Sequence, residues 1–166
     1  MVGLLSVISA TLLFSLSGFD LKHRRLPNIW VGAYAFLFLP FAIFSGFGWS
    51  QLGWHVLAAA IAFVVTSIFF ALRWMGGGDV KLWAAIMLWA GPHLALPVVI
   101  IATLAGGIVG MLSWLARWQL RRSPQCAGRK FLRLWSADRG VPYGVALSLA
   151  GVFVLYAYAK ALMPLN

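Results

Sequence analysis

The sequence predicts an all-α polytopic membrane protein with about six transmembrane helices. Hydrophobic residues make up 63% of the chain and charged residues 10%, whereas soluble proteins carry roughly 45–50% and 25%. Several apolar stretches approach the ~20 residues that a helix needs to cross a bilayer. A chain of 166 residues forms about one domain. We therefore expect a single integral membrane domain over residues 1–166.

The apolar stretches define six expected spans, in chain order. The first 19 residues lack the basic start of a signal peptide, so we expect a retained first helix. Pro27 and Asn28 open the second span, a short loop over 47–53 leads to the third, and a glycine run opens the fourth. The fourth is short, so five spans with a re-entrant fourth segment is an alternative. The six spans cover residues 2–19, 29–46, 54–74, 79–90, 95–118 and 143–163.

The basic residues predict the orientation, because cytoplasmic loops are enriched in Lys and Arg. With the amino terminus outside, 12 of the 13 basic residues fall inside. Only Lys160 falls outside. The net charge of +10 therefore fits lipid contact better than nucleic-acid binding, since no basic soluble domain is present. The inside residues are Lys22, Arg24, Arg25, Arg73, Lys81, Arg117, Arg121, Arg122, Arg129, Lys130, Arg133 and Arg139.

The longest extramembrane segment is the basic cytoplasmic loop expected at about 117–141. Its alternation of basic and apolar residues is typical of an amphipathic helix on the inner leaflet. Most tryptophans fall near span ends, which predicts an interfacial aromatic belt. Small residues around Gly106 predict close helix contact in the fifth span.

The chain has only three acidic residues, all Asp, and two of them lie at the expected cytoplasmic edge. A membrane protein excludes carboxylates from lipid, so each that remains is a candidate functional residue. Asp20 ends the first span, and Asp79 opens the fourth after Gly76, Gly77 and Gly78. Asp138, just before the sixth span, is better explained as a helix cap or a partner of a loop Arg.

A pair of nearby carboxylates predicts peptide hydrolysis by an activated water. Two such groups about 3 Å apart share one proton. The ionised member draws a proton from water, and the protonated member donates to the substrate carbonyl oxygen. Asp79 is expected to cap its helix at the N-terminus, which favours the anion, so we take Asp79 as the resting base and Asp20 as the resting acid.

Several neighbouring residues are expected to support this site. Gly76, Gly77 and Gly78 allow the backbone to turn sharply and to approach an extended substrate closely. Lys22 and Lys81 each lie two residues after an Asp. That spacing turns them away from the acid on a helix, so we expect them to anchor at lipid headgroups.

The residues predict neither a metal nor another cofactor. Cys126 is alone, which excludes a disulfide framework and a thiolate cluster. His55 and His93 are expected outside and far apart, which argues against a metal site. His23 is three residues from Asp20 and is expected in a solvated loop.

Three phrases make the chain resemble the type IV prepilin peptidases, which are GxGD membrane aspartyl proteases. The phrases are DLKHRRLPN at 20–28, GGGDVK at 76–81 and VPYG at 141–144. The resemblance implies a multi-pass enzyme of the bacterial inner membrane with catalytic Asp20 and Asp79. Gly76, Gly77, Gly78, Lys81, Pro27 and Asn28 match the supporting motif. Such enzymes cut the short basic leader from prepilins or pseudopilins on the cytoplasmic side, for assembly into a pilus or secretion filament.

The chain departs from larger members of that family in one respect. Those members carry a cytoplasmic insert with paired CxxC motifs and also N-methylate the new amino terminus. This chain has only Cys126 and resembles the short peptidases of tight-adherence (Flp-type) pilus systems. We therefore expect cleavage without dependence on S-adenosylmethionine.

Two other classes of function compete with the peptidase. In a proton-coupled transporter or channel subunit, Asp20 and Asp79 would form a relay, but relays place carboxylates near mid-bilayer. In a structural scaffold of a secretion complex, both acids would be dispensable.

Overall fold

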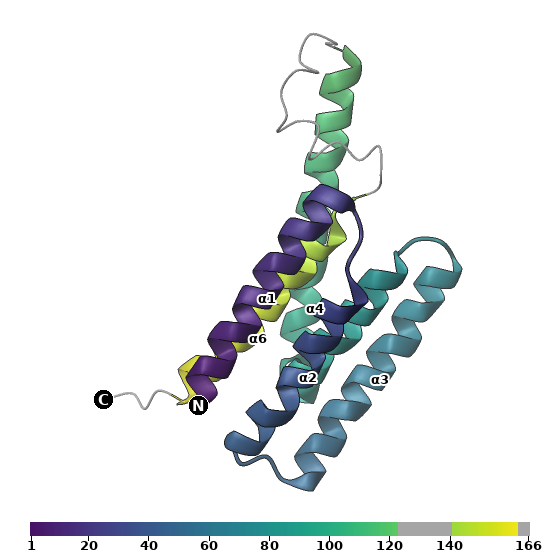
Figure 1. Ribbon diagram of the computed structural model, residues 1–166. Coiled ribbons are helices and arrows are strands. Elements are labelled where there is room, and N and C mark those ends of the chain that lie inside the picture. Colours follow the sequence, from purple (N-terminus) through teal and green to yellow (C-terminus); the bar gives the residue numbers. More distant parts are fainter. Residues whose placement is uncertain (123–140, 163–166) are drawn as a thin grey trace.

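The computed structural model describes residues 1–122 and 141–162, and within them every regular element is a helix (Figure 1). Four of the helices are long and apolar enough to span a membrane, and α2 is a shorter apolar helix. The fold is therefore the all-α polytopic arrangement that the composition predicts. The helices are α1 (Val2–His23), α2 (Asn28–Phe44), α3 (Trp49–Ala71), α4 (Gly77–Arg122) and α6 (Tyr143–Leu162).

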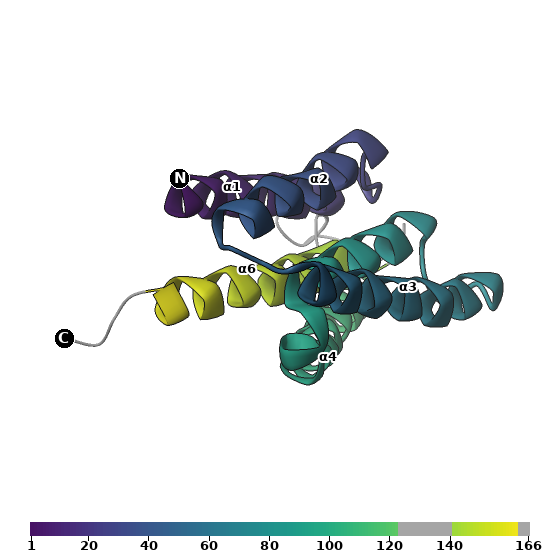
Figure 2. The same cartoon turned by 90° about the horizontal axis from the view of Figure 1, so that it is seen from below.

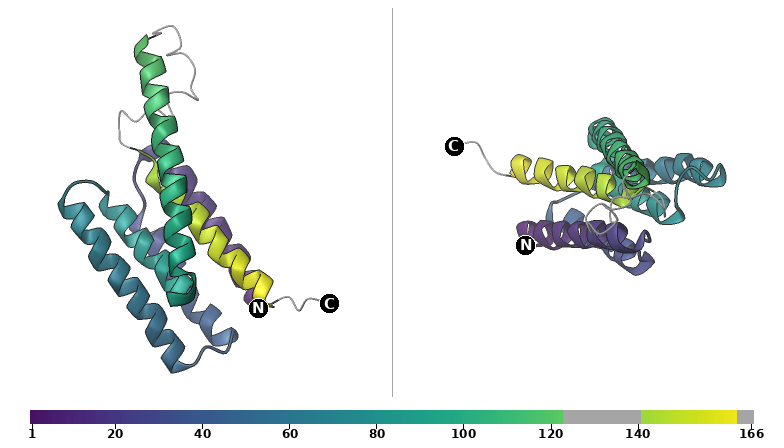
Figure 3. Two further views of the ribbon diagram at one scale, coloured as in Figure 1. Left: turned by 180° about the vertical axis from the view of Figure 1, so that it is seen from behind. Right: turned by 90° about the horizontal axis from the view of Figure 1, so that it is seen from above.

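Helix α6 lies between α1 and α4, and packs against both (Figures 2 and 3). Helix α2 packs against α1 and α4, while α3 lies at the edge and packs mainly against α4. The end of α1, the start of α4 and the start of α6 meet at one end of the bundle, whereas the amino terminus lies at the other (Figure 1). Three segments that are distant in sequence thus share one end.

Helix α4 contains two of the expected spans, 79–90 and 95–118, on either side of a kink at Gly91. Gly91 adopts φ 59° and ψ −172°, a conformation that is essentially restricted to glycine. Pro92 follows it and has no N–H to donate to the carbonyl of Leu88. His55 supplies that bond instead, with Nδ1 2.7 Å from the Leu88 oxygen. The Tyr158 hydroxyl donates to the Trp89 oxygen at 3.0 Å, so side chains satisfy both carbonyls.

Helix α3 begins five residues earlier than the sequence predicts, at Trp49 rather than at 54. The cause is a cap. Gly48 precedes the helix in extended conformation, and the Gln51 side-chain oxygen accepts its backbone N–H at 3.0 Å. This half of a capping box satisfies an N-terminal amide and allows the helix to start there. The predicted loop over 47–53 is therefore mostly helical.

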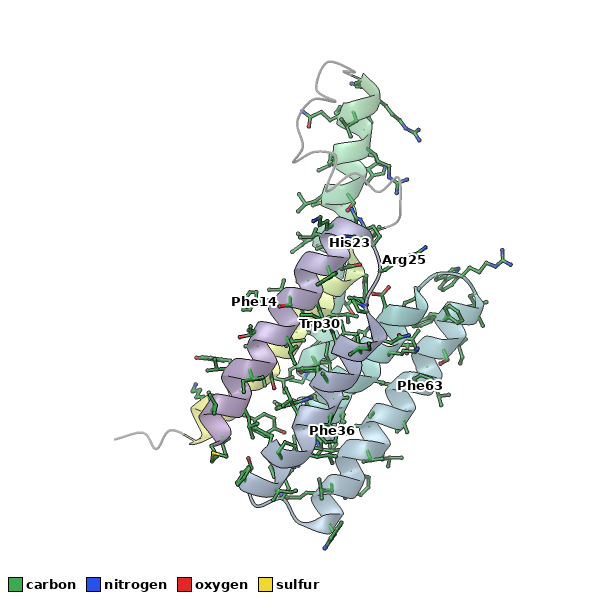
Figure 4. All side chains as sticks on the ribbon, viewed as in Figure 1. Phe14, His23, Arg25, Trp30, Phe36 and Phe63 are labelled. Atoms are coloured by element: carbon green, nitrogen blue, oxygen red, sulfur yellow. The ribbon has the colours of Figure 1, made fainter. Side chains whose placement is uncertain are left out.

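The core is aromatic and centres on Trp89, which is fully buried. Its ring stacks on Tyr34 at 5.4 Å, and its Nε1 donates to the Tyr34 backbone oxygen at 3.0 Å. Trp83 is also buried, so the predicted interfacial belt is wrong for these two tryptophans. Large apolar side chains such as Phe14, Phe36 and Phe63 instead cover the exterior, where lipid would meet them (Figure 4).

The predicted basic loop at about 117–141 starts later than expected, because residues up to Arg122 belong to α4. From Pro92 to Arg122 this limb has a length of about 46 Å at 1.5 Å per residue. That exceeds the ~30 Å hydrocarbon core of a bilayer, so its basic last turns project beyond the core. The predicted amphipathic helix, Cys126 and Asp138 fall outside the described residues.

Candidate active site

Asp20 lies in the last turn of α1 and, among the described Asp, Lys and Arg residues, is the one that is buried, with 5% of its surface exposed. The backbone N–H of Gly144 donates to its Oδ2 at 2.8 Å. Gly144 is the second residue of α6, where backbone amides have no partner in their own helix and the helix dipole favours an anion. The carboxyl end of one helix therefore places its acid at the amino end of another.

Gly144 is also pressed directly against Asp20. A Cβ atom at position 144 would lie 2.9 Å from Oδ2, 3.0 Å from Cγ and 3.1 Å from Cβ of Asp20. Rotation of the carboxylate alone would not relieve these contacts, because the Cβ of Asp20 is among them. Only glycine fits between the two helices at this separation.

Asp79 is the third residue of α4, so the prediction that it forms the N-cap is wrong. The helix begins two residues earlier, at Gly77. The carboxylate turns back toward Gly76, whose backbone N–H donates to it. An acid at the third position that bonds back to the start of its helix is the second half of a capping box. Asp79 thus remains at the electropositive end of α4.

Asp20 and Asp79 line the same cavity, of about 620 Å³, which we call the carboxylate cavity. The negative charge of Asp20 acts on Asp79. Tyr143, the first residue of α6, lines the cavity too, and its hydroxyl is within range of the charge on Asp79. Its ring lies where a Cβ on Gly106 would clash with it, so this glycine makes the close helix contact that the sequence predicts.

Two arginines complete the wall of the carboxylate cavity, and both have unusual backbones. Arg24 has φ 53° and Arg73 has φ 60°, values that residues other than glycine seldom adopt. Both follow helix ends, where a left-handed residue is a common terminator. Burial lowers the pKa of the Arg24 guanidinium below its ordinary value, and the charge of Asp20 opposes that effect. The cavity thus combines two acidic residues with two basic residues.

The three glycines before Asp79 serve close packing against the protein's own side chains. A Cβ at Gly76 would lie 3.0 Å from the Asp79 carboxylate, one at Gly77 3.4 Å from Phe70, and one at Gly78 3.0 Å from the Leu26 Cβ. None of the three has a positive φ, so their backbone conformation does not itself require glycine. They bring the 24–27 linker and the end of α3 close to the start of α4.

Lys81 does not simply extend to headgroups, as the sequence led us to expect. Its Nζ donates to Oδ1 of Asn28 at 3.0 Å. Asn28 is the first residue of α2, and Pro27 is its N-cap with φ −65°, as the proline predicts. This bond ties the start of α2 to the start of α4 and brings the supporting residues together.

The structure brings His55 and His93 closer than the sequence predicts. Both line one cavity at the other end of the bundle, although 38 positions separate them in the chain. His55 bonds to Leu88 and thus has a structural role at the kink. Within residues 1–122 and 141–162, no group of three or more His, Cys, Asp or Glu could hold a metal ion.

Sequence reasoning missed Arg24, Arg73, Tyr143 and Gly144 as site residues. The phrase at 141–144 pointed to the last two, but only as part of a resemblance. Residue type alone gives little signal for a backbone N–H donor such as Gly144. Arg24 and Arg73 were counted as loop charges, because a left-handed backbone that turns a side chain into a cavity is not visible in a sequence.

A comparison with known families identifies the class of protein that this site belongs to. Residues 7–111 match the Type IV leader peptidase family. The matched segment covers most of the chain and includes both Asp20 and Asp79. The chain therefore belongs to the Type IV leader peptidase family.

The relatives are similar over most of this chain. It is 27% identical to the prepilin leader peptidase/N-methyltransferase of Xanthomonas campestris pv. campestris, over 91% of this chain and 49% of that protein. It is 28% identical to the type 4 prepilin-like proteins leader peptide-processing enzyme of Escherichia coli O78:H11, over 92% and 51%. A Legionella pneumophila prepilin leader peptidase/N-methyltransferase is 25% identical, over 92% and 50%. The chain spans about half the length of these relatives. No solved structure matches it.

Proposed function

We propose that this protein is an aspartic-type endopeptidase that removes the short basic leader from prepilin-like subunits. One observation carries the proposal: two of the chain's three acidic residues, from helices α1 and α4, line a single cavity. Leader processing is the activity named for its relatives. A pair of carboxylates that share a proton needs no metal to activate water.

In the proposed mechanism a water molecule between Asp20 and Asp79 attacks the scissile carbonyl. The ionised carboxylate takes a proton from the water, and the protonated one donates to the carbonyl oxygen. We assign Asp20 as the ionised base, the reverse of the assignment from the sequence. The Gly144 amide and the charge of Arg24 both favour the anion at Asp20, against burial and the dipole of α1. The negative charge of Asp20 in turn disfavours a second anion at Asp79. Asp79 then holds the shared proton.

The chain is well suited to a test of this assignment, because it contains only three Asp residues. Protein labelled with 13C at the Asp side-chain carboxyl gives three signals, which the three Asp→Asn variants assign. A pH titration by NMR should show Asp20 ionising at lower pH than Asp79, within the limits of a coupled pair. The opposite order would restore the assignment made from the sequence.

The site is proposed to face the cytoplasm of a bacterium whose inner membrane holds the protein. The described residues near the carboxylate cavity include the basic Lys22, Arg24, Arg25, Arg73 and Lys81. Lys160 lies near the other end of α6, about 25 Å along the helix from Tyr143. Positively charged ends of membrane proteins stay in the cytoplasm. Substrates of the Flp type, and docking of the enzyme to pilus or secretion machinery, follow from the resemblance of the chain.

The direct experiment compares variants on a prepilin substrate. Purified wild type, Asp20→Asn, Asp79→Asn and Asp138→Asn are mixed with the substrate, and the released leader is followed by mass spectrometry. We expect the first two variants to lose cleavage almost completely and Asp138→Asn to keep most of it. Full processing by Asp20→Asn or Asp79→Asn would reject the catalytic pair.

The same assay tests whether methyl transfer accompanies cleavage. Two of the relatives are named as N-methyltransferases as well as peptidases, and we propose that this chain only cleaves. Addition of S-adenosylmethionine should leave the rate and the mass of the cut subunit unchanged. A product heavier by one methyl group would contradict this part of the proposal.

A further inference from the structure

A second cavity, of about 550 Å³, runs along α3 and opens beside the carboxylate cavity. We call it the apolar groove. One wall is a single face of α3, from Trp54 to Phe69, whose lining residues recur every three or four positions. Met87 and Val99, from the two limbs of α4, contribute to the other wall. The α3 wall is about 22 Å long at 1.5 Å per residue. The groove is therefore long enough for about 15 residues of a second helix.

The apolar groove and the carboxylate cavity share three lining residues, Phe69, Met75 and Tyr143. Phe69 ends the α3 wall of the groove, Met75 lies in the segment before α4, and Tyr143 also lies within range of the charge on Asp79. A chain that occupied the groove and continued past these three residues would enter the space between Asp20 and Asp79. The groove thus leads into the candidate site.

The chemistry of the groove matches an apolar helix. No charged side chain among the described residues lines it. The Thr66 hydroxyl on its wall already donates to the backbone oxygen of Ala62 at 2.7 Å, so it has no need of a ligand. Only His55 and Thr66 of α3 are buried, which leaves this edge helix open to a partner. In a bilayer such a surface associates by close packing rather than by burial from water.

We propose that the apolar groove holds the apolar stem of a membrane-anchored protein substrate and presents the peptide bond beyond the stem to Asp20 and Asp79. This inference rests on the proposed peptidase function and adds the subsite that positions the substrate. Continuity with the carboxylate cavity favours a substrate over a lipid acyl chain. A substrate chain can extend past Phe69, Met75 and Tyr143 to the two Asp residues, whereas an acyl chain has no group for them to act on. Binding of the stem supplies the orientation that hydrolysis requires.

The test compares two substrates and two matched variants. One substrate carries the full apolar stem, and the other is a short peptide with only the leader and the cut site. Ala58 lines the groove, and Ala58→Phe fills it. Ala60 is exposed and outside the groove, about 200° around the same helix, so Ala60→Phe is the control. We expect Ala58→Phe to lower the ratio of kcat/KM for the full substrate to that for the short peptide by about tenfold.

Ala60→Phe should leave that ratio at the wild-type value. If Ala58→Phe leaves the ratio unchanged, or lowers both rates equally, the groove is not the stem subsite. Wild type that cleaves both substrates in that case keeps its peptidase function, so only the groove proposal is overturned. Wild type that cleaves neither substrate would overturn both proposals.

Cross-linking gives a second measurement that needs no cleavage and no large substitution. In an Asp20→Asn, Cys126→Ser protein, Ala58→Cys should cross-link to a cysteine in the stem of the full substrate, whereas Ala60→Cys should not. Substrate that co-purifies with the protein but cross-links at neither position would show that the stem binds elsewhere, and would overturn the proposal.

Discussion

At the scale of single residues, the separation between Asp20 and Gly144 decides how the candidate site is built. The Asp20 carboxylate accepts a hydrogen bond from the backbone amide of Gly144. There is no room for a Cβ atom at Gly144. A backbone donor at a helix start is fixed by the helix itself, so the bond does not require a second side chain to lose conformational entropy. Asp20 is therefore oriented before any substrate arrives.

Gly144→Ala should lower prepilin cleavage by about a hundredfold, because a displacement of roughly 1 Å at a catalytic group has an effect of that size. The added methyl group would lie about 3 Å from three atoms of Asp20. Gly18→Ala is the matched control, since it lies on α1 near Asp20 and its Cβ would meet nothing within 4 Å. Cleavage rates of both variants at equal protein concentration check the prediction; equal activity would contradict it.

At the scale of elements, the kink in α4 sets the direction of both of its limbs. The first limb carries Asp79 into the carboxylate cavity, and the second packs against α6, which carries Gly144. The ring of His55 lies against Gly91, where a Cβ would come within 2.5 Å of it. The kink therefore depends both on a glycine backbone and on a histidine that replaces a missing helix bond.

Gly91→Ala should lower the free energy of unfolding by about 3 kcal/mol, because it imposes a strained backbone as well as a steric clash. Thermal unfolding in detergent measures this loss. Gly107→Ala in the second limb is the control: its Cβ meets nothing within 4 Å, and alanine should stabilise the helix there by about 0.5–1 kcal/mol. A Gly91→Ala protein as stable as wild type would show that the kink tolerates a side chain.

The sequence predicts elements better than it predicts breaks within them. Helix existence follows from apolar length, so α1, α2, α3 and α6 lie close to their expected positions. The start of α3 was missed because the Gly48–Gln51 cap lies before the apolar run. The expected spans 79–90 and 95–118 leave a break beside Gly91, and α4 does turn there. The sequence did not show that the helix continues through this turn instead of forming a loop. Trp89 was expected at an interface because it lies near the end of the expected span 79–90, and the sequence does not show which helices surround it.

At the scale of the whole molecule, charge and site coincide. Both carboxylates and most of the described basic residues lie where α1 ends and α4 begins, and that end was predictable because loop charges and span order are visible in a sequence. The contact between Asp20 and Gly144 was not predictable. The two residues are 124 positions apart in the chain. Their contact depends on the position of α6 along the axis of α1, which the apolar pattern of the two helices does not determine.

The proposed topology predicts which loops face which side of the membrane. In a Cys126→Ser background, Arg25→Cys and Trp49→Cys place single thiols at exposed positions on opposite ends of α2. A membrane-impermeant maleimide should label Trp49→Cys in intact spheroplasts and Arg25→Cys only after the membrane is permeabilised. The reverse pattern would place the carboxylate cavity outside the cell.

The bond from Gly144 to Asp20 also has a consequence for how the protein is made. The two acids are translated early, within the first 79 residues, but the amide that fixes one of them emerges from the ribosome much later. A nascent chain with α1 to α4 already in the membrane thus carries both acids in an unfinished arrangement. Docking of α6 is then the step that brings the Gly144 amide to Asp20, so we expect the arrangement around Asp20 to form only after most of the chain has been synthesised.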